Sequence, residues 1–304
     1  MTSIEPRPNN NQRIAIITGA TSGLGYETAL ELAQQNWNVI LTGRNDIKGT
    51  AALEAIQKLY PQATIEYQNL DLASLASVAS FSQSIKQRDL AIDVLVNNAG
   101  VMAPPTQTLT EDGFELQFGT NHLGHFALTA QLLSQLQKAP HPRVVNVSSI
   151  SHRQGKINFK DLQSHQSYDP MKAYAQSKLA NILFTLELDR LSQERGWNIQ
   201  SIAAHPGVSE TPLFYSGPGT TRFLARLLQF AIPYISQSAK DGAQPILQAI
   251  LDPNATGGQY YGPQGFQEIK GKSGLAKISR HAKNPETAKQ LWDVSEQLTG
   301  IIWP

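Results

Sequence analysis

The sequence predicts an α/β protein in which helices cover both faces of one doubly wound parallel sheet. Short apolar runs of strand length alternate with stretches of helical periodicity, an order typical of parallel sheets. The runs themselves, such as Val144-Val145-Asn146-Val147, are mostly apolar, as expected for strands buried on both faces. No linker rich in Pro, Gly or Ser divides the alternation. We therefore expect a single domain over residues 13–304, preceded by a disordered polar arm over residues 1–12.

The alternation can be followed through most of the chain. Apolar runs bounded by turn residues predict strands at 13–18, 38–42, 64–68, 93–96, 143–147 and 199–204. Apolar residues at helical spacing predict helices at 26–35, 50–59, 75–86, 121–137 and 172–194. Breaks in the pattern come late, at Pro206-Gly207, at Gly217-Pro218-Gly219 and at 263–265. We expect these late loops to shape the substrate site.

Composition excludes several classes of protein. The 304 residues carry a net charge of +1 without a long basic run, so we expect no nucleic-acid partner. The absence of cysteine excludes disulfides, thiolate nucleophiles and thiolate metal sites. The most apolar window, residues 223–235, is too short to span a bilayer and is interrupted by Arg226, Gln229 and Pro233. We expect a soluble, cytoplasmic protein with no transmembrane segment.

A glycine-rich turn separates the first predicted strand from the first predicted helix. At this place backbone N–H groups and the positive end of a helix can hold a pyrophosphate. A tight strand-to-helix turn without a ligand would use the same residue types. Its position after a predicted strand favours a dinucleotide site, for which the candidate residues are Gly19, Thr21, Ser22, Gly23, Leu24 and Gly25.

The end of the second predicted strand indicates which dinucleotide is bound. An acidic residue there would bond the ribose 2′-hydroxyl of NAD(H), whereas an arginine can meet the 2′-phosphate of NADP(H). The strand ends Leu41-Thr42-Gly43-Arg44, without a carboxylate, and Ser22 is available in the glycine turn. We therefore expect NADP(H) as the cofactor, the alternative being that Arg44 is a solvated loop residue.

Polar residues also follow the third and fourth predicted strands. Asn, Asp and Gly are common in plain turns, but ligands of open α/β sheets bind at the carboxyl ends of strands. The joint placement favours a role in cofactor binding for Asp71, Leu72, Asn98, Ala99 and Gly100.

Tyr174 and Lys178 lie four residues apart in a predicted helix, so their side chains share one face. A free tyrosine titrates near pH ~10 and needs a nearby positive charge to act as an acid or base at neutral pH. The spacing alone is common and is usually structural. It becomes informative beside Ser149 at the end of the fifth strand and Asn121 at the start of a helix. A serine hydroxyl can donate to a developing oxyanion while the tyrosine supplies the proton.

Taken together, these motifs resemble the short-chain dehydrogenase/reductase family from Arg13 to about Pro263. The resemblance rests on TGATSGLG at 18–25, NNAG at 97–100, Asn121, Ser149, YAQSK at 174–178 and HPG at 205–207. It implies a Rossmann-like domain with Tyr174 as general acid/base and Ser149 as oxyanion donor. It also implies that Lys178 holds the nicotinamide ribose and lowers the tyrosine pKa, and that Asn121 supports a proton-relay water. Further cofactor-binding residues implied by the resemblance are Pro206, Gly207, Val208 and Thr211.

Within that family the chain is similar to the retinol dehydrogenase, WW-domain oxidoreductase and protochlorophyllide reductase branch. The similarity is carried by NHLGHF at 121–126, the long segment 150–173 between Ser149 and Tyr174, and LWDVSE at 291–296. Light-dependent pigment reductases use a cysteine that this chain lacks, which disfavours that activity. A non-catalytic NADP(H)-binding sensor is a further alternative. A sensor would need only the glycine turn, so the presence of Ser149, Tyr174 and Lys178 disfavours it. His122 and His125 have no evident third partner, so we expect no metal site.

The segment after Pro206-Gly207 carries an apolar stripe at helical spacing, which in this family forms a substrate lid over about 208–240. The stripe contains Phe214, Tyr215, Phe223, Leu224, Leu227, Leu228 and Phe230. An apolar lid fits a lipophilic aldehyde, ketone or alcohol, such as a retinal-like aldehyde. Packing on the body, peripheral membrane contact and a homo-oligomer interface remain equally open uses of such a stripe. The predicted function is NADP(H)-dependent interconversion of a carbonyl and an alcohol.

Overall fold

The computed structural model describes residues 12–209 and 236–304, so most of the predicted lid, Thr211 and nearly all of the N-terminal arm lie outside the described residues. Its strands are β1 (Ile14–Ile17), β2 (Asn38–Gly43), β3 (Ile65–Asn69), β4 (Val94–Asn97), β5 (Arg143–Val147), β6 (Gln200–Ala204), β7 (Tyr260–Pro263) and β8 (Ser273–Leu275). Its α-helices are α1 (Gly23–Gln34), α2 (Asp46–Leu59), α3 (Leu75–Gln87), α4 (Leu116–Phe118), α5 (Gly124–Gln131), α6 (Leu133–Leu136), α7 (Pro170–Arg195), α10 (Ala239–Leu251) and α11 (Pro285–Thr299). A π-helix, η1 (Gly119–Leu123), and the 3-10 turns η2 (Ile150–Gln154), η3 (Phe266–Glu268) and η4 (Arg280–Lys283) complete the described elements.

The strands form one sheet in the order β3-β2-β1-β4-β5-β6-β7-β8. β1 to β7 run parallel, and only the edge strand β8 pairs antiparallel, with β7. The chain builds outward from β1 to β3 and then returns to the other side of β1 with β4. This reversal creates the crevice at which open α/β sheets bind ligands.

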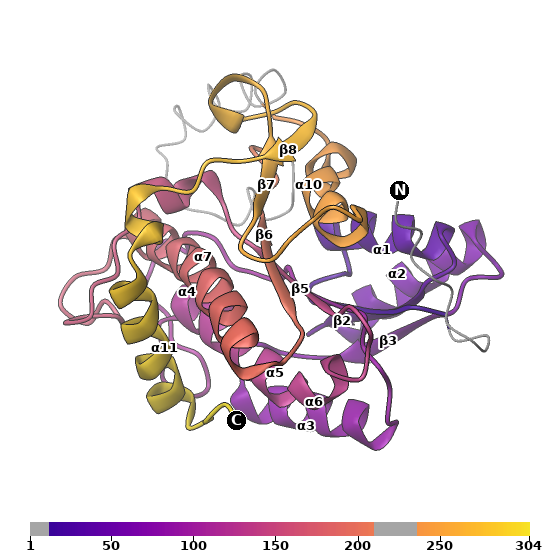
Figure 1. Cartoon of the computed structure of the whole chain (residues 1–304), viewed down its shortest axis with the longest axis horizontal. Helices are drawn as coiled ribbons and strands as arrows, with labels where there is room; N and C mark the ends of the chain where they lie inside the picture. Colours follow the sequence, from indigo (N-terminus) through magenta and orange to yellow (C-terminus); the bar gives the residue numbers. More distant parts are fainter. Residues whose placement is uncertain (1–11, 210–235) are drawn as a thin grey trace.

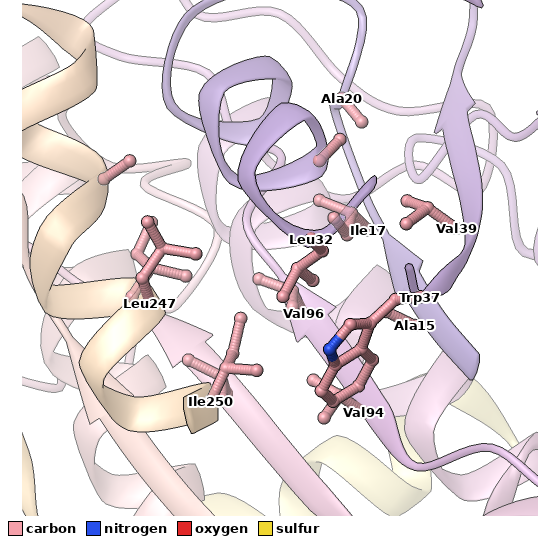
Figure 2. Packing of buried hydrophobic residues seen from close by; sticks show 14 of the residues in the cluster. Ala15, Ile17, Ala20, Leu32, Trp37, Val39, Val94, Val96, Leu247 and Ile250 are labelled. Carbon is pink, nitrogen blue, oxygen red and sulfur yellow. The ribbon is translucent and has the colours of Figure 1, made fainter. Parts of the chain in front are cut away.

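Helices cover both faces of the sheet (Figure 1). Alternate residues of β1 show this directly: Ala15 and Ile17 pack under α1, α2 and α10, whereas Ile14 and Ile16 pack under α3, α5, α6, α7 and α11. Figure 2 shows the first of these layers, in which Leu32 of α1 and Ile250 of α10 lie over Val96 of β4. The central strands β1 and β4 are buried at every position, which accounts for their mostly apolar sequences, whereas β3 at one edge of the sheet reads IEYQN and is only partly buried. The predicted doubly wound, single-domain α/β fold is confirmed.

The predicted helix over 121–137 is not continuous. Residues 119–123 form the π-helix η1. α5 ends at Gln131, and Leu132, with a φ of −93° and a ψ of 3°, separates it from α6. Close packing accounts for the glycine after the π-turn, since a Cβ on Gly124 would lie 2.4 Å from the carbonyl oxygen of Leu72. Wide π-turns inside helices occur often at functional sites. Here the π-turn contains Asn121.

The C-terminal helix α11 packs against the body through aromatic rings. The ring centroid of Trp292 lies 5.1 Å from that of Phe126 and 4.6 Å from that of Trp303. The buried His122 of η1 joins this contact, with its Nε2 2.8 Å from Ser295 Oγ of α11. The Ser295 hydroxyl donates to the Leu291 carbonyl, so His122 must donate from Nε2. None of the helices within the described residues is long and apolar enough to cross a bilayer.

His122 and the neighbouring His125 predict how stability depends on pH. Burial lowers the pKa of His122 to about 3 and that of His125 to about 4, against 6.5 in an exposed chain. The two pKa values are lowered only in the folded protein. Each histidine therefore contributes its full stabilisation above pH 6.5, and this contribution is lost as the pH falls below 6.5. Going from pH ~7 to pH ~5 should lower the free energy of unfolding by about 2 kcal/mol per histidine.

Urea unfolding measured across this pH range tests the prediction. His122→Phe places a non-titrating ring among Phe118, Phe126 and Phe184, and it should remove the share of one histidine, about 2 kcal/mol of the difference in the free energy of unfolding between pH ~7 and pH ~5. The exposed His281 supplies the control variant His281→Gln, which should leave the pH dependence as it is. A wild-type free energy of unfolding that is flat between pH ~5 and ~7 would contradict the neutral buried histidines.

Candidate active site

A pocket of about 440 Å³ opens at the carboxyl ends of the central strands. The predicted residues that line it are Gly19, Thr21, Ser22, Gly23, Leu24, Arg44, Asp71, Leu72, Asn98, Ala99, Gly100, Ser149, Tyr174, Lys178, Pro206, Gly207 and Val208. Two predicted residues, Gly25 and Asn121, are buried directly behind this lining. Segments from six strand ends and from α7 therefore meet in one place.

The glycine turn leaves space for a ligand at the start of α1. Gly19 has a φ of +65°, and a Cβ there would lie 2.8 Å from the Ala99 Cα; a Cβ on Gly25 would lie 2.5 Å from Asn98 Nδ2. Ser22 is the N-cap of α1, but its side chain makes no capping hydrogen bond. The free hydroxyl and the first N–H groups of the helix can therefore bind an anion. This turn fits the pyrophosphate of a dinucleotide.

The hydroxyl of Thr18 joins the glycine turn to two other walls of the pocket. Its Oγ1 accepts hydrogen bonds from the backbone N–H groups of Asn98 (2.8 Å) and Ala99 (2.9 Å). The His125 ring donates from Nδ1 to the Asn121 carbonyl at 2.9 Å, so its Nε2 accepts the Thr18 proton at 2.8 Å. Asn98 binds back from its side chain to the carbonyl of Thr18. The histidine is thus a neutral bridge to η1.

Arg44 lies at the rim of the pocket, directly after β2. Its side chain is exposed, and no carboxylate within residues 12–209 and 236–304 forms an ion pair with it. The adjoining Gly43 allows a close approach, because a Cβ there would lie 2.8 Å from Thr21 Cγ2. A positive charge is therefore available beside the glycine turn.

The structure distinguishes the two serines that follow β5. The Ser148 hydroxyl donates to the Lys178 carbonyl at 2.7 Å and so fastens α7 to the sheet. The Ser149 side chain lines the pocket and caps η2 by accepting from the Ser151 N–H at 3.2 Å. Of the two, Ser149 has the hydroxyl suited to meet a substrate.

Tyr174 and Lys178 occupy successive turns of α7, and both side chains are buried. The Lys178 Nζ lies 5.8 Å from the centroid of the Tyr174 ring and donates to the Val147 carbonyl at 3.1 Å. Burial raises the pKa of Tyr174 to about 12, although the neighbouring Ser149 hydroxyl lowers it in part. Burial also lowers the pKa of Lys178 to about 8, so the amine is mainly protonated at neutral pH. In the protein alone, desolvation outweighs the expected lowering of the tyrosine pKa.

Asn121 supports this pair from behind. Its side chain accepts from the Val101 N–H and donates to the Val101 carbonyl and to Ser177 Oγ, all within 2.9 Å. A Cβ on Gly100 would lie 3.0 Å from Asn121 Oδ1 and 3.5 Å from Lys178 Nζ. Asn121 therefore fixes the loop after β4 against α7.

The loop after β6 closes the remaining side. Gly207 has a φ of +66°, and a Cβ there would lie 2.1 Å from the Ile269 carbonyl oxygen. The same carbonyl accepts from the Val208 N–H at 2.8 Å. The loop at 206–208 is thus held by the segment after β7, where the sequence indicated a break at 263–265 but no contact with this loop.

Several residues that line the pocket were not predicted from the sequence. They are Thr18, Thr42, Gly43, Leu70, Val101, Met102, Thr120, Val147, Ser148, Ile150, Ser151, Met171 and Ser209. Most of them adjoin a predicted residue, and Thr18 begins the glycine motif itself. Met102 and Met171 have no local signal, because only the fold brings them to the pocket.

The two histidines that suggested a metal have separate partners. His122 points to Ser295, and His125 lies between Thr18 and Asn121. Within the described residues there is no group of three or more His, Cys, Asp or Glu side chains that could hold a metal ion.

Sequence comparisons find relatives over nearly the whole chain. Human polyprenol dehydrogenase is 38% identical over 303 residues, which cover 98% of this chain and 87% of that protein. Human retinol dehydrogenase 12 is also 38% identical, over 96% of this chain and 87% of its own length.

Solved structures show the same fold. A crystal structure of an uncharacterised protein from Mycobacterium paratuberculosis has a TM-score of 0.80 and 41% identity, covering 98% of this chain and 97% of that one. Actinorhodin polyketide ketoreductase with NADPH has a TM-score of 0.64 and 24% identity, covering 83% and 95% of the two chains. The family model of the short chain dehydrogenases matches residues 13–217. The chain is therefore a member of the short chain dehydrogenase family and belongs with its retinol dehydrogenase-like oxidoreductases.

Proposed function

We propose that this oxidoreductase interconverts a carbonyl and an alcohol with NADP(H) as its cofactor. The observation that carries the proposal is the meeting of Ser149, Tyr174 and Lys178 in the pocket that also contains the glycine turn. Each supplies a different need of carbonyl reduction: a hydrogen bond to oxygen, a proton and a fixed positive charge. A protein that only sensed the dinucleotide would not require this combination.

The reaction uses the site residues in separate roles. The bound nicotinamide would supply a hydride to the carbonyl carbon, or accept one from the alcohol. During reduction the Ser149 hydroxyl donates a hydrogen bond to the carbonyl oxygen, and Tyr174 gives its phenolic proton to the same oxygen. Lys178 holds the ribose and keeps a positive charge beside the phenol, which favours the tyrosinate left behind. In the oxidation direction Tyr174 takes the proton back.

Three features support NADP(H) over NAD(H). Arg44 provides an exposed cation beside the glycine turn, the Ser22 hydroxyl makes no capping bond, and no carboxylate occupies positions 42–44. A 2′-phosphate would accept charge-assisted hydrogen bonds from such groups. The remaining predicted contacts, from Asp71 to Gly100 and at 206–208, would hold the adenosine and the nicotinamide ends. Thr211 is proposed for the nicotinamide end from the family resemblance alone.

A lipophilic aldehyde, ketone or alcohol fits the other part of the pocket. The side chains of Val101, Met102, Ile150 and Met171 make this part apolar, and Met171 is 47% exposed at its mouth. Apolar walls with a few polar groups are typical of small-molecule sites. The names of two relatives, polyprenol dehydrogenase and retinol dehydrogenase 12, denote long apolar alcohols, which supports a retinal-like or polyprenal-like substrate.

Replacing the proposed acid tests the mechanism. Tyr174→Phe removes the phenolic proton while keeping the ring, so kcat for reduction of a polyene aldehyde should fall by about 10²- to 10⁴-fold. NADPH affinity, followed by fluorescence titration, should change little because Lys178 remains. Tyr60→Phe, outside the pocket, is the control and should keep wild-type turnover. Turnover by Tyr174→Phe at the wild-type rate would overturn the assignment.

Replacing the rim arginine tests the cofactor preference. Arg44→Leu should weaken NADPH binding by about 10- to 100-fold, the worth of charge-assisted hydrogen bonds to one phosphate. NADH binding should stay within about twofold, because NADH lacks the 2′-phosphate. Dissociation constants for both cofactors are compared with those of Lys58→Leu, an exposed lysine of α2 outside the pocket. Equal losses for NADPH and NADH would show that Arg44 does not read the 2′-phosphate.

A further inference from the structure

The turn after β7 holds two consecutive non-glycine residues in the left-handed region of backbone conformation. Gln267 has a φ of 49° and Glu268 a φ of 61°. Non-glycine residues rarely adopt this conformation, and it persists only where surrounding contacts enforce it. The contacts here converge on the carboxylate of Glu268, whose side chain is only 12% exposed although it lies in a surface turn.

Glu268 binds two segments that flank the pocket. Its Oε2 forms an ion pair with Nη2 of Arg153 and accepts from Nε2 of His205 at 3.1 Å, while Oε1 accepts from the Lys277 N–H at 3.1 Å. The His205 ring accepts the Gly207 N–H at Nδ1, so its proton lies on Nε2 and points at the carboxylate. The Glu268 carboxylate, Arg153, the Lys277 N–H and a neutral His205 therefore all have partners.

The charges agree with these hydrogen bonds. Burial raises the pKa of Glu268, but the hydrogen bonds from His205 and Lys277 and the charge of Arg153 bring that pKa below its ordinary value. Burial lowers the pKa of His205, which keeps the ring neutral. The carboxylate is thus ionised and the histidine uncharged at neutral pH.

The first segment bound by Glu268 carries the proposed oxyanion donor. Arg153 belongs to η2, the turn that begins directly after Ser149. In the same turn His152 donates from Nδ1 to the Ser149 carbonyl at 2.6 Å, and its Nε2 accepts the Ser279 N–H at 3.3 Å. The backbone of Ser149 is therefore held from the side that faces the C-terminal part of the chain.

The second segment is the loop at 206–208. His205 directly precedes it and fixes the Gly207 N–H, and the residue after Glu268, Ile269, accepts from the Val208 N–H at 2.8 Å. The loop and the serine turn are far apart in sequence and come from different strands. Residues 268 and 269 connect them.

We propose that Glu268 is a positioning residue for the reaction, which sets the serine turn and the loop at 206–208 at a fixed distance across the pocket. This inference rests on the proposed function, because the two segments would carry the oxyanion donor and the nicotinamide contact. Small displacements of reacting groups, of about 1 Å, can lower rates by about 100-fold. A residue that touches neither substrate nor cofactor can therefore control the chemical step.

Glu268→Gln tests the inference with the side-chain shape retained and the charge removed. We expect kcat to fall about tenfold, since the two segments lose their common anchor, while the NADPH dissociation constant changes less than about threefold. Arg153→Met should give a similar loss. In the double variant the losses should multiply only in part, because both substitutions break the Arg153–Glu268 ion pair. Each kcat is calculated per molecule of protein that binds NADPH, so a smaller folded fraction of a variant does not lower its kcat.

Gln267→Gly is the matched control within the same turn. Glycine suits the positive φ, and the carboxylate of Glu268 is kept, so kcat should remain at the wild-type value. A kcat of Glu268→Gln equal to that of Gln267→Gly would overturn the inference, as would fully multiplicative losses in the double variant.

A second measurement keeps the inference separate from the proposed function. Amide hydrogen exchange of peptides covering 149–155 and 204–209 should become faster in NADPH-bound Glu268→Gln and stay unchanged in Gln267→Gly. This result is expected even if no carbonyl is reduced by the wild-type protein, an outcome that would contradict the proposed function alone. Unchanged exchange in both peptides of Glu268→Gln would overturn the positioning role.

Discussion

The Thr18 hydroxyl is the contact on which the pocket most depends. It accepts two backbone N–H groups from the loop after β4 and donates to His125, which in turn holds the Asn121 carbonyl in the π-turn. One side chain at the end of β1 thereby joins the glycine turn, the loop that lines the pocket and the residue behind Lys178. The arrangement requires a neutral imidazole, which burial enforces. The same burial is the reason why we expect the free energy of unfolding to fall in acid.

The order of the central elements and most of the pocket follow from the sequence. Apolar strands alternating with helices require a sheet buried on both faces, and in a parallel sheet all carboxyl ends meet at one edge. Motifs that follow successive strands, such as those ending in Gly100 and Ser149, must therefore converge. Both serines after β5 are visible in the sequence, but only the structure distinguishes them, because the Ser148 hydroxyl donates to the Lys178 carbonyl.

Other features depend on contacts that no local pattern shows. The π-turn at Asn121 interrupts a segment with good helical spacing, and it is set by tertiary packing against Thr18 and α7. Asn284 caps α11 and Gly300 ends it with a φ of 66°, so this helix did carry start and stop signals in the sequence. Glu268 had no such signal. Its proposed positioning role comes from a turn with positive φ values that brings its carboxylate between two loops distant in sequence.

A buried Tyr174 needs a partner if it is to act as the proposed acid or base at neutral pH. In the protein alone burial raises its pKa to about 12, so the phenol holds its proton and is suited to donate during reduction. Oxidation requires the opposite state, and a bound cation beside the ring would favour it. We therefore propose that the redox state of the bound cofactor decides whether Tyr174 gives or takes the proton.

Transfer of a labelled hydride tests whether this protein moves a hydride from NADPH to a carbonyl carbon. The wild-type protein is incubated with a polyene aldehyde and NADPH carrying deuterium at C4 of the nicotinamide, and the alcohol is analysed by mass spectrometry. We expect an alcohol with deuterium on the former carbonyl carbon from one of the two C4-labelled epimers. An alcohol without deuterium from both epimers would contradict hydride transfer in this pocket, as would bound NADPH that is never oxidised by any aldehyde or ketone.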